Sequence, residues 1–157
     1  MIPLLVATAT GLHVLATVVF IGYYLLLSLI YLPVLAKPDM GSSAVLGEIS
    51  KRSRPWMYVS LIVFILTGVY LMLVDSNYLG IGNFGNPWAI LMVVKHIVVL
   101  AMIVIGFWYN AVKRVGQDLR SYPGDAQRLA RFRRYVDVMT ICGVLVLVLT
   151  ALAQVRP

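Results

Sequence analysis

Charged residues are scarce in this chain of 157 residues, and cysteine is almost absent from it. Only 12% of the residues are charged and 61% are hydrophobic, whereas soluble domains carry about 25% and about 45–50% respectively. A soluble core of one domain has no use for this much apolar surface. The composition therefore indicates that the chain is folded in a lipid bilayer.

Several motifs that carry chemistry are also missing. The chain has no CxxC pair, no CxxCH haem-attachment motif, no P-loop and no HExxH motif. Its one cysteine, Cys142, lies in an apolar run and is expected to be a small packing residue. The net charge is +7, but the basic residues lie between apolar runs and not on an aromatic-rich face. We therefore expect no nucleic acid among the partners, and we attribute the charge to membrane topology.

Four apolar segments are each near the roughly 20 residues needed to cross a bilayer. They cover residues 4–35, 56–74, 88–112 and 135–155 of a single domain that spans residues 1–157. Pro55 is expected to lie before the second helix, and Pro87 in the first turn of the third. The sequence thus predicts an all-α integral membrane protein, an up-down bundle of four transmembrane helices that spans the cell (inner or plasma) membrane as a multi-pass protein.

Basic residues indicate how this bundle is oriented. They gather between the first and second segments and between the third and fourth, whereas the loop between the second and third has none. The positive-inside rule places the two basic loops in the cytoplasm, so the N- and C-termini are expected outside. The basic residues of these loops are Lys37, Lys51, Arg52, Arg54, Lys113, Arg114, Arg120, Arg128, Arg131, Arg133 and Arg134.

The two histidines both lie inside predicted helices, where ionisable groups are costly and usually functional. His13 lies roughly 14 Å along the first helix and His96 roughly 12 Å along the third, at 1.5 Å per residue. Because these helices run in the same direction, we expect the two imidazoles at similar depth. Such a pair suits axial ligation of a haem iron or two nitrogen ligands to copper. The alternative role for each is a hydrogen bond between helices.

Residues near the histidines refine these possibilities. Small residues flank His13 on its helix face, which makes room for a macrocycle or permits close helix packing. Met92, one helical turn before His96, is either a soft copper ligand or an apolar packing residue. Lys95 is either a counter-charge for a propionate or substrate, or a side chain that extends to the membrane surface.

Short motifs in three of the segments point to a known family. They are Leu12-His13 in the first segment, Thr67-Gly68 in the second, and Lys95 and Asn110 in the third. With these residues the chain resembles the CopD-type membrane domain, the copper resistance protein D group, and the related HemJ-type protoporphyrinogen oxidases. The resemblance implies a four-helix module associated with copper handling or haem chemistry, with functional roles for His13 and Lys95.

Three functions are compatible with these features. The favoured one is a b-type haem protein with His13 and His96 as axial ligands and Lys95 nearby, which transfers electrons to a quinone or a redox partner protein. The second is a copper-binding or copper-transport protein with His13, His96 and Met92 as ligands. The third is an accessory subunit of a larger membrane complex, or a homo-oligomer. If the chain is an enzyme, we expect a haem-dependent membrane oxidoreductase.

Overall fold

The computed structural model describes residues 2–35, 42–78, 80, 85–109 and 126–155. The helices are α1 (Ile2–Leu26), the π-helical turn η1 (Leu27–Tyr31), α2 (Leu32–Leu35), α3 (Ser42–Val74), α4 (Pro87–Phe107) and α6 (Ala126–Val155). Within these described residues, four spans are long and apolar enough to cross a membrane, namely Pro3–Leu35, Val45–Val74, Pro87–Phe107 and Gln127–Val155. The predicted all-α bundle of four transmembrane helices is therefore confirmed.

Two helices begin earlier than the sequence predicted. α3 begins at Ser42 and not near residue 56, so the expectation that Pro55 precedes this helix was wrong. Ser53, in the adjacent turn, donates to the carbonyl oxygens of Ile49 (2.8 Å) and Ser50 (3.2 Å), and the helix continues through Pro55. The physical reason for the error is that hydropathy marks the part of a helix inside lipid, whereas the helix itself continues into polar sequence.

The same reason applies to the fourth span. α6 begins at Ala126 and not near residue 135, because its first turns are polar and basic. The third helix was expected to reach residue 112, and its last three residues fall outside the described part of the chain. Lys37, Asn110, Lys113, Arg114 and Arg120 also lie outside the described part.

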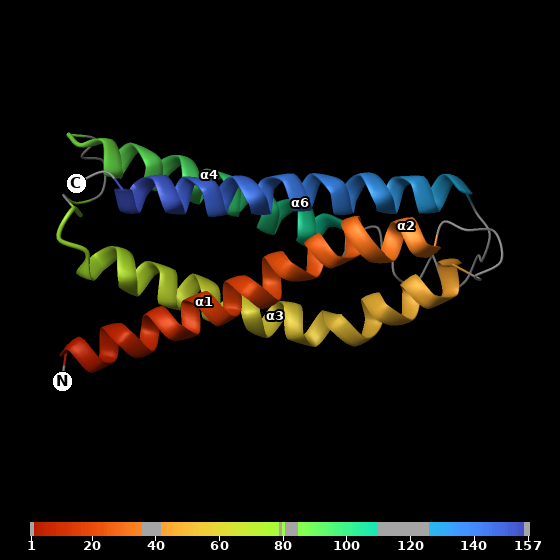
Figure 1. Cartoon of the computed structure of the whole chain (residues 1–157), viewed down its shortest axis with the longest axis horizontal. Helices are drawn as coiled ribbons and strands as arrows, with labels where there is room; N and C mark the ends of the chain where they lie inside the picture. The colour runs from red at the N-terminus through yellow and green to blue at the C-terminus, as the bar shows by residue number, and fades with distance from the viewer. Residues whose placement is uncertain (1, 36–41, 79, 81–84, 110–125, 156–157) are drawn as a thin grey trace.

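The four spans pack as two pairs (Figure 1). α1 lies along α3 and α4 lies along α6, and contacts between α1 and α6 join the pairs. The start of α1, the end of α3, the start of α4 and the end of α6 share one end of the bundle, which we call the terminal end. The opposite end, where α2 ends and α3 and α6 begin, is the distal end. The side of the membrane that each end faces stays a prediction from the basic residues.

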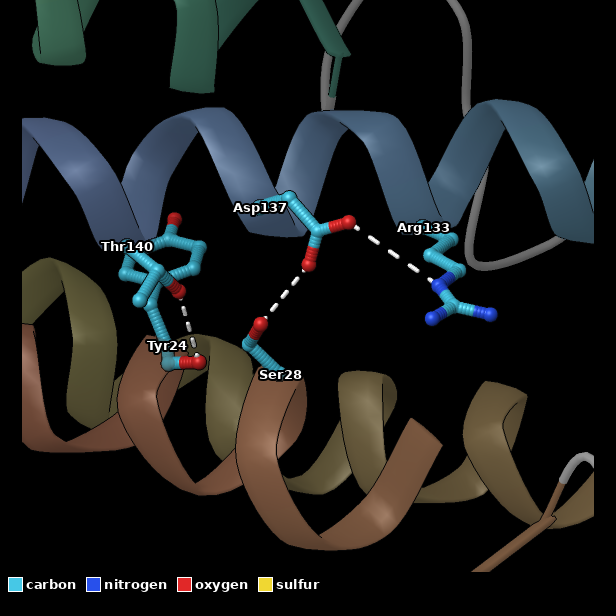
Figure 2. Close-up of polar contacts among 5 residues, drawn as sticks. All are labelled: Tyr24, Ser28, Arg133, Asp137 and Thr140. Carbon is cyan, nitrogen blue, oxygen red and sulfur yellow. Dashed lines mark hydrogen bonds and ion pairs between the residues drawn. The ribbon is translucent and has the colours of Figure 1, made fainter. Parts of the chain in front are cut away.

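Polar contacts tie α1 and the following turn η1 to α6 toward the distal end (Figure 2). Ser28 Oγ donates to Asp137 Oδ1 over 2.7 Å, and Arg133 Nε lies 3.9 Å from Asp137 Oδ2. Thr140 Oγ1 donates to the main-chain oxygen of Tyr24 over 3.0 Å, shortly before the π-helical turn begins. These bonds fix how α1 lies along α6.

Close packing continues this interface toward the middle of the bundle. A Cβ atom added at Gly143 of α6 would lie 2.9 Å from Ile21 Cγ2 of α1, so only glycine allows this approach. Val136 and Met139, on the same helix, have no exposed surface. Small residues such as Gly143 let transmembrane helices approach closely. The main core of the bundle therefore lies between α1 and α6.

Candidate functional site

Three of the residues singled out from the sequence line one pocket in the bundle. His13 comes from α1, and Lys95 and His96 come from α4, while α3 supplies Phe64 and Gly68. The pocket has a volume of about 310 Å³, and we call it the histidine pocket. Its remaining lining residues are Ile65, Val69, Val99, Leu100 and Ile103.

A hydrogen bond from α1 to α3 indicates which nitrogen of the His13 ring carries the hydrogen. His13 Nδ1 lies 2.9 Å from Thr67 Oγ1. The Thr67 hydroxyl donates its single hydrogen to the main-chain oxygen of Val63 over 2.6 Å, so it accepts the hydrogen on His13 Nδ1. His13 Nε2 therefore carries the lone pair, which is the state in which an imidazole binds a metal.

Two further contacts hold the His13 ring in position. The ring stacks on Phe64, with centroids 4.6 Å apart and planes inclined by 20°. A Cβ atom at Gly68 would lie 3.0 Å from His13 Cε1, so glycine leaves the space that the ring occupies. The Thr67-Gly68 pair, recognised in the sequence only as a family-like motif, thus positions the imidazole from the neighbouring helix.

His96 has the same tautomer for a different reason. Its Nδ1 lies 2.6 Å from the main-chain oxygen of Met92, and a carbonyl oxygen can only accept, so Nδ1 carries the hydrogen. His96 Nε2 is then also a lone-pair donor to a metal. The side chain of His96 is exposed at the surface of the bundle, whereas Lys95 beside it is partly buried.

Met92 is not among the residues that line the histidine pocket. It packs instead against Trp88, Ala89 and Ala153, in a small apolar cluster that also includes Met72. Within the described residues there is no group of three His, Cys, Asp or Glu side chains placed to hold a metal ion. A metal in the histidine pocket would therefore rely on the two imidazoles.

A second pocket, of about 120 Å³, lies next to the first on the distal side, and Ile103 lines both. We call it the methionine pocket, because Met57, Met102 and Met139 line it from α3, α4 and α6. Its polar lining residues are Tyr23, Tyr24, Ser50, Ser53, Arg54, Tyr58, Tyr109 and Tyr135. The sequence did not reveal this pocket, because its residues are far apart along the chain.

A run of aromatic rings connects the two pockets. Successive centroids along it are between 4.3 and 6.5 Å apart. Tyr24 and Tyr135 within it also share a hydrogen bond of 2.8 Å between their hydroxyl groups. The rings in order are His13, Phe64, Phe20, Tyr24, Tyr135 and Tyr109.

The fold and the pocket together define a multi-pass protein of the cell membrane with two imidazole groups along one pocket of the bundle. The chain belongs to the CopD family, because the family model "Copper resistance protein D" matches residues 47–153. Thr67, Gly68, Lys95 and His96 lie inside this match, and His13 lies before it. A search of curated proteins and a search of solved structures each found no match.

Family membership links the chain to copper resistance. It also reverses the preference for haem over copper that was expected from the sequence. Copper, which the sequence offered as the alternative, is the ligand that the family name supports. Haem b, bis-histidine ligation and electron transfer were favoured from the sequence, and they receive no support from the family match. Partners beyond the lipid bilayer stay predictions as well.

Proposed function

We propose that this protein binds copper between His13 and His96 as a step in moving copper into or across the membrane. The observation that carries the proposal is that both imidazoles line one pocket with Nε2 as the lone-pair atom. Membership of the copper resistance protein D family supports copper as the ion. Copper is then the cargo of the protein and not a resident cofactor.

The chemistry of the pocket favours copper in its monovalent state. Imidazole nitrogen is a good ligand for copper, and Cu(I) is satisfied by two ligands, which is the number of imidazoles that line the pocket. Lys95 adds a positive charge to the same pocket and opposes any bound cation. Weakened binding suits an ion that must leave again, so the three residues together fit a transit site better than a storage site.

Haem b is the second candidate, and one observation favours it. Lys95 lies in the pocket with both imidazoles, where its ammonium group could pair with a haem propionate. Two imidazole ligands would fill both axial positions of the iron and direct the haem toward electron transfer. The two candidates use the same histidines but assign opposite roles to the charge of Lys95.

Copper binding to purified protein tests the proposal directly. The chain in detergent is titrated with Cu(I) against a chromophoric chelator under reducing conditions, as wild type and as His13→Ala/His96→Ala. Thr10→Ala is the matched control, since Thr10 is on the same helix and bonds only within it, to the main-chain oxygen of Val6. We expect the double variant to lose one copper per chain and the control to lose none.

An optical spectrum of the same preparations separates the two candidates. The copper proposal fails if the double histidine variant binds as much copper, as tightly, as the Thr10→Ala control. Haem b takes its place if protein from haem-replete cells has a b-type reduced-minus-oxidised spectrum that both single histidine variants lose. A chain that binds neither ligand points to the third function, an accessory subunit.

A further inference from the structure

The methionine pocket brings together sulfur atoms that the sequence keeps apart. Five methionines lie in the described residues, at positions 57, 72, 92, 102 and 139. Three of them, Met57, Met102 and Met139, line this one pocket from three different helices. Met102 and Met139 are almost fully buried, with 2% and 0% of their surface exposed. Three thioethers around one cavity form a possible ligand set for a soft metal ion.

The three methionines also pack in the main core of the bundle, where Met102 and Met139 are buried and Met57 packs against the buried residues. Methionine is common in cores because its flexible side chain fills irregular gaps. Here, however, a pocket of about 120 Å³ remains, which the three methionines line together with tyrosine, serine and apolar side chains, and this volume is ample for a single ion. The other two methionines, Met72 and Met92, pack against the Trp88 cluster at the terminal end and line neither pocket, so they serve as the comparison for methionines outside the pocket.

The charge of the pocket selects among copper ions. Thioether ligands are neutral and soft, and they favour Cu(I) over harder ions. Arg54 also lines the pocket, and its Nε is buried without a hydrogen-bond partner among the described residues. Repulsion from its guanidinium group scales with the charge of the ion, so a divalent ion is opposed twice as strongly as Cu(I).

We propose that Met57, Met102 and Met139 form a second, Cu(I)-selective site that exchanges copper with the histidine pocket. Ile103 lines both pockets, so the two pockets adjoin at this side chain. The assignment of copper rests on the proposed function, whereas the thioether ligand set rests on the geometry of the second pocket alone. The bundle then holds a nitrogen site toward the terminal end and a sulfur site toward the distal end.

Metal stoichiometry combined with X-ray absorption at the copper edge tests this site. The full chain in detergent is loaded with Cu(I) as wild type, as Met57→Leu/Met102→Leu/Met139→Leu and as His13→Ala/His96→Ala. Leucine keeps the volume of methionine with little change in packing. Met72→Leu/Met92→Leu is the matched control, because these methionines lie outside the pocket.

The expected results differ for each variant. Wild type and the control bind two Cu(I) ions per chain, with both nitrogen and sulfur neighbours. The triple leucine variant keeps one ion with nitrogen neighbours, and the double histidine variant keeps one with sulfur neighbours. Met57 is partly buried, so Met57→Leu alone provides a milder variant, which should weaken the sulfur site by about tenfold or more.

Failure of this inference is distinguishable from failure of the proposed function. One nitrogen-ligated ion in wild type, unchanged in the triple leucine variant, overturns the methionine site and leaves the histidine site standing. A sulfur-ligated ion in a chain whose histidines do not bind copper supports the methionine site and overturns the proposed function. Sulfur neighbours that persist in a correctly folded triple leucine variant overturn the assignment of these three residues.

Discussion

The two halves of the bundle differ in what their polar side chains do. Toward the distal end, Ser28, Asp137 and Thr140 use their hydrogen bonds to hold α1 against α6. Toward the terminal end, His13 and Thr67 hold α1 against α3, but each imidazole keeps one nitrogen lone pair for a ligand. The hydrogen bonds of the distal half thus specify the arrangement of the helices, whereas the histidines of the terminal half also offer nitrogen atoms that can bind.

The concentration of helix-positioning contacts in one region is possible because the solvent around the bundle is lipid. Lipid is as apolar as a leucine side chain, so transmembrane helices associate through close packing and hydrogen bonds and not through the hydrophobic effect. The contacts that define the bundle can therefore be concentrated in one region. Substitutions at the hydrogen bonds between the first span and α6 should change stability with little effect on copper, and substitutions in the histidine pocket should do the reverse.

The largest effect is expected at the close approach of α6 to α1. Gly143→Val places new carbon atoms where even a Cβ would lie 2.9 Å from Ile21 Cγ2, and overpacking of this kind costs up to about 3 kcal/mol. The free energy of unfolding, measured by denaturation in mixed micelles, gives the value. Gly22→Val is the control, since a Cβ there meets nothing within 4 Å. Equal losses in the two variants would contradict the close packing.

The next effect concerns the hydroxyl that orients His13. Thr67→Val keeps the shape of the side chain but removes the acceptor for the hydrogen on Nδ1, so the ring loses its fixed tautomer. Loss of such a supporting bond typically weakens metal binding by about 10- to 100-fold. A chelator competition titration measures the change, with Thr10→Val as control. Stability should change little, and an unchanged affinity would remove Thr67 from the site.

Lys95→Leu compares the two candidate ligands in the same pocket. Removal of the positive charge should raise the affinity for Cu(I) by about tenfold, a modest part of the roughly 4 kcal/mol between unit charges 4 Å apart at an effective dielectric constant of 20. Haem would lose a partner for its propionate instead, and its affinity would fall. Titration of this one variant with Cu(I) and with haem therefore separates the two functions, because the affinity rises for copper and falls for haem.

The smallest effect is expected for a single hydrogen bond in the distal half. Ser28→Ala removes the donor to Asp137, and such bonds between transmembrane helices contribute on average about 0.6 kcal/mol. Thr8→Ala is a suitable control, because Thr8 is exposed and bonds only to Leu4 of its own helix. Copper affinity should be unchanged in both. A loss of copper affinity in Ser28→Ala would show that the two halves are coupled.

Hydropathy predicted the four membrane helices well, because lipid demands a long apolar run from each of them. It predicted the starts of α3 and α6 poorly, because their first turns are polar and contain basic residues. The boundary of the membrane and the boundary of a helix are separate properties, and only the first leaves a strong signal in composition.

The candidate site was partly accessible from the sequence. Depth along parallel helices indicated that His13 and His96 could meet, and they line one pocket with Lys95. Which face of each helix meets its neighbour depends on packing between helices, which spacing along the chain does not report. For that reason Met92 was offered as a ligand although its side chain packs outside the histidine pocket, while the methionine pocket and the part played by Thr67 were missed.

The π-helical turn η1, Leu27–Tyr31, lets the first transmembrane span contain one residue more than a regular α-helix over the same turn. A π turn closes its hydrogen bonds one residue later than an α turn, so it acts as a one-residue insertion within an otherwise regular helix. Each residue of an α-helix turns the chain by about 100°. An inserted residue would therefore rotate the rest of the span, but the wider π turn absorbs it and the two sides of the turn keep their faces. In an alignment of relatives, a single gap here would mark a regular α-helix whose flanking residues meet the same neighbours.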